Sequence, residues 1–381
     1  MSAKTIFSNA LPILLSLTIG GIGGGVFYYF HLPLPWMLGA MIATFAVVMG
    51  GAKLKAPAML RPIVISVIGV MLGSGFDSGI LADARAWAVS LAFLGLYLAV
   101  ASAIVVPFYT HIGKFDRTTA FFAAMPGGVN DMMLIGEAMG ADPRKIILAH
   151  AARILVTIAV IAFWFRVVLG LKVTGFAIEP VSLGMVDVAI LTACAVAGVY
   201  LGGWLRLPAA QLVGPMILSA IVHITGLTHS APPPVLVIVA QVVLGTVLGC
   251  RFVGAPKPMV VRSLVLSLGA TLLTLTVTLV FAVLFHGLFG QTAEQVILAY
   301  APGGLTEMSL VALSMNAEVA YISVHHLARI ALVIANNHPE YSKIDLEKII
   351  ATMSDDAFVY DYWNNLSEMP AEVLEHRYVT V

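Results

Sequence analysis

The sequence Ala-Met-Pro-Gly-Gly-Val-Asn-Asp-Met at residues 124–132 reappears, 176 positions later, as Tyr-Ala-Pro-Gly-Gly-Leu-Thr-Glu-Met at residues 300–308. In both places Pro-Gly-Gly interrupts an apolar segment, and this combination ends a helix because proline removes a backbone donor. Two further landmarks keep the same offset: His-x-x-Arg-Ile at 150–154 and 326–330, and Gly-x-x-x-Gly at 69–73 and 245–249. Several matches in order at one spacing predict an internal duplication.

Composition places the duplicated part in a lipid bilayer. Of the 381 residues, 60% are hydrophobic and 10% are charged, whereas soluble domains are about 45–50% apolar and about 25% charged. A transmembrane helix needs about 20 mostly apolar residues. The two Pro-Gly-Gly segments, 118–140 and 293–315, are apolar but broken. Ten uninterrupted spans are expected, at 10–30, 34–51, 59–76, 86–109, 145–168, 185–204, 209–226, 234–250, 263–287 and 318–335.

The distribution of Lys and Arg indicates how the broken segments lie, because cytoplasmic loops are enriched in these residues. If the N-terminus is cytoplasmic and both broken segments return to their own side, only Arg85, Arg166 and Lys172 lie outside. Twelve cations then lie inside: Lys4, Lys53, Lys55, Arg61, Lys114, Arg117, Arg144, Lys145, Arg206, Arg251, Lys257 and Arg262. If both segments cross fully, the same residues divide into 8 inside and 7 outside. The hairpin arrangement gives five spans per repeat, and an odd number inverts the second repeat.

We therefore expect an all-α polytopic membrane protein with two inverted repeats of five transmembrane helices. Each repeat contains a re-entrant or broken Pro-Gly-Gly helix. Repeat 1 covers 8–170 and repeat 2 covers 185–335, with its last helix truncated, and both termini are cytoplasmic. Residues 1–335 hold 17 Lys and Arg against 11 Asp and Glu, whereas residues 336–381 hold 3 against 9. The last segment is expected to be an acidic soluble tail.

Each break is a candidate binding site, because irregular backbone at membrane depth is tolerated only where protein or a water-filled cavity satisfies its polar groups. After each break we expect a helix with a capping residue and then an acid in its first turn. In transporters built from inverted repeats, paired breaks of this kind hold the substrate and the coupling ion. The alternative is a tight surface loop whose acids only neutralise the helix dipole. The candidate residues are Pro126, Gly127, Gly128, the cap Asn130 and the acid Asp131, and Pro302, Gly303, Gly304, the cap Thr306 and the acid Glu307.

Charged groups are also expected on the helix after each break. His150 and Arg153 are three residues apart, as are His326 and Arg329, so each pair shares one helical face. A charge at bilayer depth costs about 2.5–3.5 kcal/mol on insertion scales and normally has a partner. The acid at each break is the expected partner of the arginine in the same repeat. Alternatively, the arginines snorkel to the headgroups. The histidines could relay protons near neutral pH, although a histidine in an apolar helix is more often simply hydrogen-bonded.

No residue pattern indicates a metal or a cofactor. Cys194 and Cys250 lie in apolar runs, where free thiols behave as small hydrophobes. No cluster of His, Asp and Glu has metal-ligand spacing. The glycine-rich run at 20–25 is not a phosphate loop, because no Lys-Ser/Thr pair ends it. We expect this run and the two Gly-x-x-x-Gly pairs to serve close helix packing.

The duplicated Pro-Gly-Gly segments, each followed by an acid-Met pair and then by His-x-x-Arg-Ile, resemble the AbrB-type bacterial inner-membrane family over about residues 8–335. Members of that family carry two copies of one membrane domain and labels such as ammonia monooxygenase or regulator of gene expression. The resemblance implies a multi-pass protein of the bacterial inner membrane without fixing its activity. It does not extend to the small DNA-binding AbrB transition-state regulators, because no soluble basic module is visible.

The C-terminal tail departs from the family pattern. The helix of His150 stays apolar to about Leu169, so its counterpart should run to about residue 345, yet it stops early. From Ala331 we expect a strand, a loop, a helix at 345–353 and a strand at 358–363. This order resembles a fragment of the C-terminal domain of UDP-sugar dehydrogenases, but it is too short to bury a core of its own. We expect no dehydrogenase activity, and the hypothesis is a gene fusion or frame rearrangement.

The leading hypothesis is a secondary transporter or exporter of a small solute, with a midplane site at the paired breaks. Asp131 and Glu307 would bind a proton or cation, and Arg153 and Arg329 would hold their charge or an anionic substrate. The alternative is a membrane-embedded regulator of gene expression that acts through a partner, and a membrane monooxygenase fits less well. The lipid bilayer and a small solute or ion are the expected partners. No nucleic acid, metal or cofactor is expected, and homo-oligomerisation is left open.

Overall fold

A computed structural model describes residues 3–76, 80–170, 183–205, 207, 209–315, 317–334, 359–361 and 378–380. Apart from two short strands, the regular structure in these ranges is helical. A helix lies at each of the ten expected spans: α1 (Ala3–Tyr29), α2 (Pro35–Met49), α3 (Arg61–Gly73), α4 (Ile80–His111), α7 (Pro143–Phe163), α8 (Met185–Trp204), α9 (Ala210–Ile224), α10 (Pro234–Gly249), α11 (Lys257–Phe289) and α14 (Val319–Ile334).

Six of these helices are long and apolar enough to cross a membrane. They are α1, α4, α7 with its π-helical end η2 (Trp164–Val168), α8, α10 with the 3-10 turn η3 (Cys250–Phe252), and α11. The other four are shorter, and α3 is preceded by a further 3-10 turn, η1 (Ala58–Leu60). The chain is therefore an all-α polytopic membrane protein.

The two repeats are inverted, and the packing of α4 against its counterpart α11 is the clearest sign of it. Arg262, near the start of α11, donates a hydrogen bond to the Gly113 carbonyl, just beyond the end of α4, at 2.8 Å. Further along the same pair of helices, the hydroxyls of Tyr97 and Thr278 are 2.9 Å apart. Residue numbers rise along one helix as they fall along the other, so the two counterparts are antiparallel.

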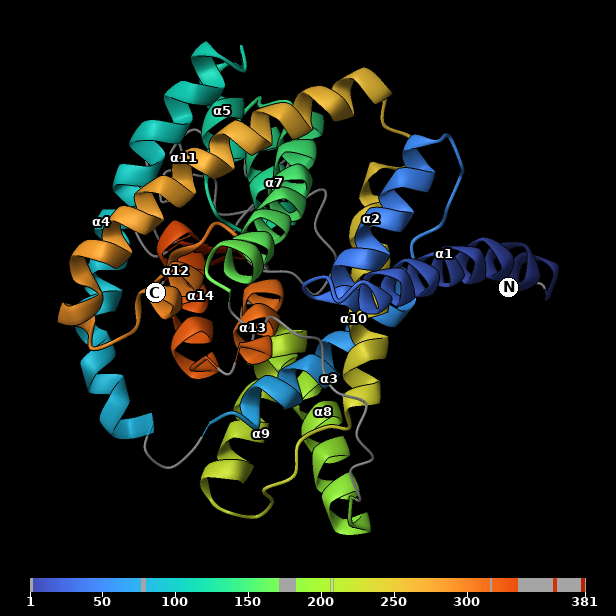
Figure 1. The fold of residues 1–381 in the computed structure, drawn as a ribbon, viewed down its shortest axis with the longest axis vertical. Helices are drawn as coiled ribbons and strands as arrows, with labels where there is room; N and C mark the ends of the chain where they lie inside the picture. Colours follow the sequence, from blue (N-terminus) through green and yellow to red (C-terminus); the bar gives the residue numbers. More distant parts are fainter. Residues whose placement is uncertain are drawn as a thin grey trace.

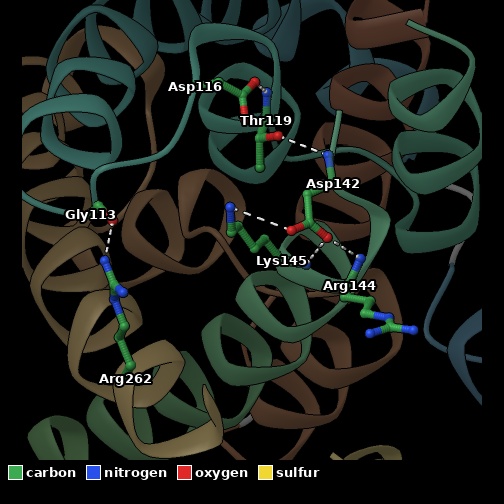
Figure 2. A network of polar contacts seen from close by, with 7 residues as sticks. All are labelled: Gly113, Asp116, Thr119, Asp142, Arg144, Lys145 and Arg262. Atoms are coloured by element: carbon green, nitrogen blue, oxygen red, sulfur yellow. Dashed lines mark hydrogen bonds and ion pairs between the residues drawn. The ribbon is translucent and has the colours of Figure 1, made fainter. Parts of the chain in front are cut away.

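Each Pro-Gly-Gly segment consists of two short helices that fold back on each other. The first hairpin is α5 (Arg117–Ala124) and α6 (Val129–Ala138), and the second is α12 (Ala293–Tyr300) and α13 (Leu305–Ser314). Thr119, at the start of α5, accepts a hydrogen bond from the backbone N–H of Asp142, beyond the end of α6, at 2.9 Å (Figure 2). In a continuous helix these residues would lie ~35 Å apart, at 1.5 Å per residue. The segment therefore returns to the side on which it began.

A polar network fixes the open end of the first hairpin (Figure 2). The Asp142 carboxylate caps α7 by accepting hydrogen bonds from the backbone of Arg144 at 3.0 Å and of Lys145 at 3.3 Å. It also lies 3.4 Å from the Lys145 ammonium. Asp116 caps α5 through the backbone N–H of Thr119 at 2.8 Å. Burial alone would raise the pKa of Asp116, but the hydrogen bonds from Thr119 and the charge of Lys145 together lower it.

The helices form two bundles, and each bundle takes elements from both repeats (Figure 1). One bundle, on the right and lower side of the view, contains α1, α2 and α3 together with α8, α9 and α10. The other contains α4 and α7, their counterparts α11 and α14, and both hairpins. Contacts of α3 with α13 and α14, and of α7 with α2 and η3, join the two bundles. The spatial units are therefore not the two sequence repeats.

The Gly-x-x-x-Gly pairs form helix contacts between the repeats. A Cβ atom at Gly69 would collide with the Leu212 carbonyl of α9, and one at Gly245 would collide with the Met37 carbonyl of α2. In the glycine-rich run of α1, Gly23 faces the α2 backbone in the same way. The expected packing role is confirmed for Gly69, Gly245 and Gly23, whereas a Cβ atom at Gly21 or Gly25 of the same run would meet no atom within 4 Å.

The tail contributes two described strands, β1 (Val359–Asp361) and β2 (Tyr378–Thr380), which pair in parallel. β1 lies within the strand expected at 358–363. The strand expected from Ala331 is wrong, because α14 continues to Ile334. An apolar segment in a membrane satisfies its own backbone groups by continuing the helix. The helix expected at 345–353 lies outside the described residues, and the gene fusion or frame rearrangement stays a hypothesis.

Candidate functional site

The second helix of each hairpin begins directly after a glycine. Gly128 is the N-cap of α6 and Gly304 is the N-cap of α13, and neither has a side-chain cap. The expected caps Asn130 and Thr306 are therefore wrong, since both residues lie inside the first turn. The acid expected in that turn is present in α13, where the Glu307 carboxylate occupies the space that a Cβ atom at Gly304 would need. The glycine thus leaves room for Glu307 to fold back over the start of its own helix.

Two buried arginines bind the tips of the hairpins. Arg153 of α7 donates a hydrogen bond from Nη1 to the Ala124 carbonyl at 3.0 Å. Arg329 of α14 donates to the Ala301 carbonyl and, at 2.5 Å, to the Gly303 carbonyl. Carbonyls at the end of a helix have no partner within that helix, so the arginines satisfy backbone groups that the breaks expose. Only 7% of Arg153 and 3% of Arg329 is exposed, and these side chains do not snorkel.

Each arginine is held in turn by the histidine one turn before it. His150 Nε2 lies 2.8 Å from the Phe122 carbonyl, so Nε2 carries the proton. His150 Nδ1 lies 2.9 Å from Arg153, which can only donate, so Nδ1 accepts. His326 makes the equivalent contacts, at 2.9 and 2.8 Å, with a carbonyl of α12 and with the guanidinium of its own helix. Both imidazoles are therefore neutral, and a proton relay through either one requires one of these bonds to break.

A cavity lies between the two hairpin tips. Repeat 1 contributes Pro126 and Arg153 to its wall, and repeat 2 contributes the equivalent Pro302 and Arg329. The cavity volume open to the centre of a water molecule is about 20 Å³, and about 10–15 Å³ is enough for one water. The rest of the wall comes from α4, α5, α11 and α12: Tyr97, Leu98, Ala101, Ser102, Val105, Tyr109, Ala124, Ala270, Thr274 and Tyr300.

The Glu307 acid of the second break is placed differently from the ion pair expected with Arg329. The cations whose charge acts on the Glu307 carboxylate are Arg251 in η3 and Arg61 at the start of α3. The hydrogen bonds of Arg329, by contrast, go to carbonyls and to His326. Asp131 lies in the first turn of α6, but its side chain is outside the described part. Among the residues that the structure describes, no three His, Cys, Asp or Glu side chains gather as metal ligands.

One buried polar network could not be expected from the repeats. Ser90 Oγ lies 2.6 Å from the Tyr321 hydroxyl and 2.7 Å from His325 Nε2. The hydroxyl of Tyr300, which lines the cavity, donates to the Ser90 carbonyl at 2.5 Å. The sequence does contain one sign of this network, a difference between the two repeats: His325 occupies the position that Ala149 holds in the first repeat.

Comparison with known proteins agrees with this architecture. The family profile described as "Transition state regulatory protein AbrB" matches residues 36–340. The chain belongs to the AbrB family. It is 24% identical over 360 residues to the "Uncharacterized protein YhjN" of Bacillus subtilis (strain 168), with 87% of this chain and 93% of the relative covered. It is 26% identical over 316 residues to the "Putative regulator AbrB" of Escherichia coli (strain K12), with 80% and 88% covered. The likeness within the AbrB family thus concerns most of the chain rather than one motif.

Proposed function

We propose that this AbrB-family protein is a secondary transporter or exporter of a small solute that binds between the two hairpin tips. The observation that carries the proposal is the shared cavity, to which each repeat contributes the same proline and the same arginine. Inverted repeats with paired breaks that face one another form the substrate sites of many transporters. The middle residues of α11, such as Ala270 and Thr274, line this cavity, which supports a site near the bilayer midplane.

The two-bundle arrangement supports alternating access. The hairpins, α4, α7, α11 and α14 form one unit that could move against the bundle of α1–α3 and α8–α10. Cations gather near the open end of the first hairpin, which favours a cytoplasmic location for that end in a bacterial inner membrane. They are Lys114, Arg117, Arg144, Lys145 and Arg262. The inverted second hairpin would then open to the other side, with both termini in the cytoplasm.

In this proposal the acids at the tips control the movement and the coupling. Glu307 lies at the tip of the second hairpin, and the cations acting on it, Arg61 and Arg251, belong to the other bundle. Its carboxylate would therefore change surroundings whenever the bundles shift. Asp131 holds the equivalent position in the first repeat. Protonation or cation binding at these two carboxylates would couple an ion gradient to solute movement.

Solute flux in proteoliposomes is the direct test. A counterflow screen of small solutes would identify a transported compound, and Asp131→Asn and Glu307→Gln should then reduce its gradient-driven flux by at least tenfold. Glu137→Gln is the matched control, because Glu137 is an exposed acid on the same hairpin and its loss should leave flux unchanged. Unaltered flux in both tip variants would remove the coupling roles, and the absence of flux for every solute would contradict transport.

A regulatory function is the second candidate, and the printed name of the Escherichia coli relative favours it. Such a protein would sense a small molecule at the cavity and pass the signal to a cytoplasmic partner. Crosslinking in intact cells distinguishes the two functions. A regulator would capture one defined partner and show no flux, whereas a transporter would show flux without such a partner.

A further inference from the structure

The wall of the cavity between the hairpin tips carries two formal positive charges. Arg153 and Arg329 both line it, and each is at least nine-tenths buried. The adjacent histidines are neutral, because their hydrogen bonds fix the uncharged form. Among the described residues that line the cavity, none is acidic. Two buried cations at one site repel each other, and such charges are stable only when paired.

Unused hydrogen-bond donors belong to residues of the same cavity wall. The Nε–H groups of Arg153 and Arg329 are buried and have no hydrogen-bond partner among the described residues. The hydroxyl of Tyr109, which also lines the cavity, is likewise buried without a partner. The neighbouring Ser267 hydroxyl acts on Tyr109 but donates its own hydrogen bond to the Ala149 carbonyl at 3.2 Å, and the geometry of a hydrogen bond between the two hydroxyls is not met. Because a buried donor without a partner costs about 1–3 kcal/mol, this cluster needs an acceptor that carries negative charge.

We propose that the cavity binds a small monocarboxylate, with the two guanidiniums and the Tyr109 hydroxyl as its donors. This inference rests on the proposed transport function and gives its solute a chemical class. A planar carboxylate matches the donor geometry of a guanidinium better than a spherical ion does. The apolar part of the wall, from Leu98 and Ala101 of α4, suits a short carbon chain. The small volume limits the ligand to the smallest monocarboxylates.

Equilibrium binding to the purified full-length protein in nanodiscs tests the ligand class. Radiolabelled acetate should bind saturably, and propionate should compete with it. Acetamide has the same shape without the charge, and gluconate has the charge but exceeds the cavity, so neither should compete. Competition by acetamide equal to that by propionate would overturn the proposal. Chloride binding without acetate binding would also overturn it, since the site would then be one for an inorganic ion.

Two single-atom variants locate the site. Tyr109→Phe removes a hydroxyl that has no protein partner and keeps the ring that stacks on Phe115, so the empty protein should stay folded. Acetate affinity should fall about tenfold, as expected for a hydrogen bond to a charged ligand. Tyr321→Phe removes a buried hydroxyl outside the cavity and should leave the affinity unchanged. Equal affinities in wild type and Tyr109→Phe would exclude this site.

The failure of this inference can be told apart from the failure of transport. Saturable acetate binding that Tyr109→Phe weakens, with no carboxylate flux in proteoliposomes, would support the anion site and contradict transport. Flux of a neutral or cationic solute that depends on Asp131 and Glu307, with no acetate binding, would support transport and overturn the anion site. Carboxylate flux that Tyr109→Phe slows at low acetate would support both.

Discussion

At the scale of single residues, the second repeat contains polar groups that the first repeat lacks. His325 Nδ1 lies 2.7 Å from the Tyr321 carbonyl and its Nε2 lies 2.7 Å from Ser90 Oγ. Because Nδ1 donates to that carbonyl, Nε2 accepts from Ser90. Ser90 also lies 2.6 Å from the Tyr321 hydroxyl, so one small side chain satisfies two larger buried groups. Tyr300 links this network to the cavity.

Replacement of Ser90 by alanine should destabilise the protein. Ser90→Ala leaves His325 Nε2 and the Tyr321 hydroxyl without their shared partner in a buried site, which costs about 1–3 kcal/mol. Thermal unfolding in detergent should show a lower midpoint. Thr276→Val is the control, because the exposed Thr276 hydroxyl bonds only to its own helix and its loss should change stability by less than about 0.5 kcal/mol. A midpoint equal to the wild type for Ser90→Ala would show that the network is not structural.

At the scale of helices, close contacts of small residues hold the repeats together. α3 packs on α9 and α10 packs on α2, so each Gly-x-x-x-Gly helix contacts an element of the other repeat. Helix positions and this packing role could be predicted from sequence, because apolar length and small-residue spacing are local properties. The N-caps at Gly128 and Gly304 were not predicted, because a glycine has no side chain to cap a helix and the nearby Asn130 and Thr306 are the usual capping residue types.

Replacement of glycine by alanine should destabilise the protein at a helix contact and should be tolerated where the glycine contacts no other helix. Gly245→Ala places a Cβ atom against the Met37 carbonyl, and overpacking of this kind costs about 1–3 kcal/mol. A Cβ atom at Gly21, in α1, would meet no atom within 4 Å. Gly21→Ala should therefore be neutral or stabilise the helix by up to about 1 kcal/mol. Denaturant unfolding of both variants checks the contrast, and equal stabilities would contradict the assigned contact.

At the scale of the whole molecule, the inverted duplication brings equivalent helices together in antiparallel pairs. α4 and α11 form one such pair and build part of the cavity wall, while the hairpins approach it from opposite ends of their bundle. The tyrosines of this wall were not among the predicted site residues. A tyrosine in an apolar span has no distinguishing local pattern, and only the packing of α4 against the hairpins places Tyr97, Tyr109 and Tyr300 at one cavity.

Cysteine labelling in intact cells tests the topology. Lys53→Cys, in the loop between α2 and α3, and Lys257→Cys, at the start of α11, are exposed positions, and the inverted arrangement requires both to be cytoplasmic. A membrane-impermeant reagent should label neither, but should label His229→Cys in the loop between α9 and α10. The native Cys194 and Cys250 are buried and should stay unlabelled. Labelling of one lysine replacement but not the other would indicate a parallel repeat.

The sequence by itself determined the helical membrane class, the duplication, the helix positions and the hairpin form of the Pro-Gly-Gly segments. These features follow from hydropathy, repeat spacing and the distribution of Lys and Arg, all of which can be measured along the chain. Only the tertiary structure decided that each bundle combines both repeats, that Glu307 is placed among Arg61 and Arg251 rather than with Arg329, and that two arginines share one cavity. The physical reason is that all the spans are similarly apolar, so their choice of neighbours depends on side-chain shape and close backbone contact rather than on hydrophobicity.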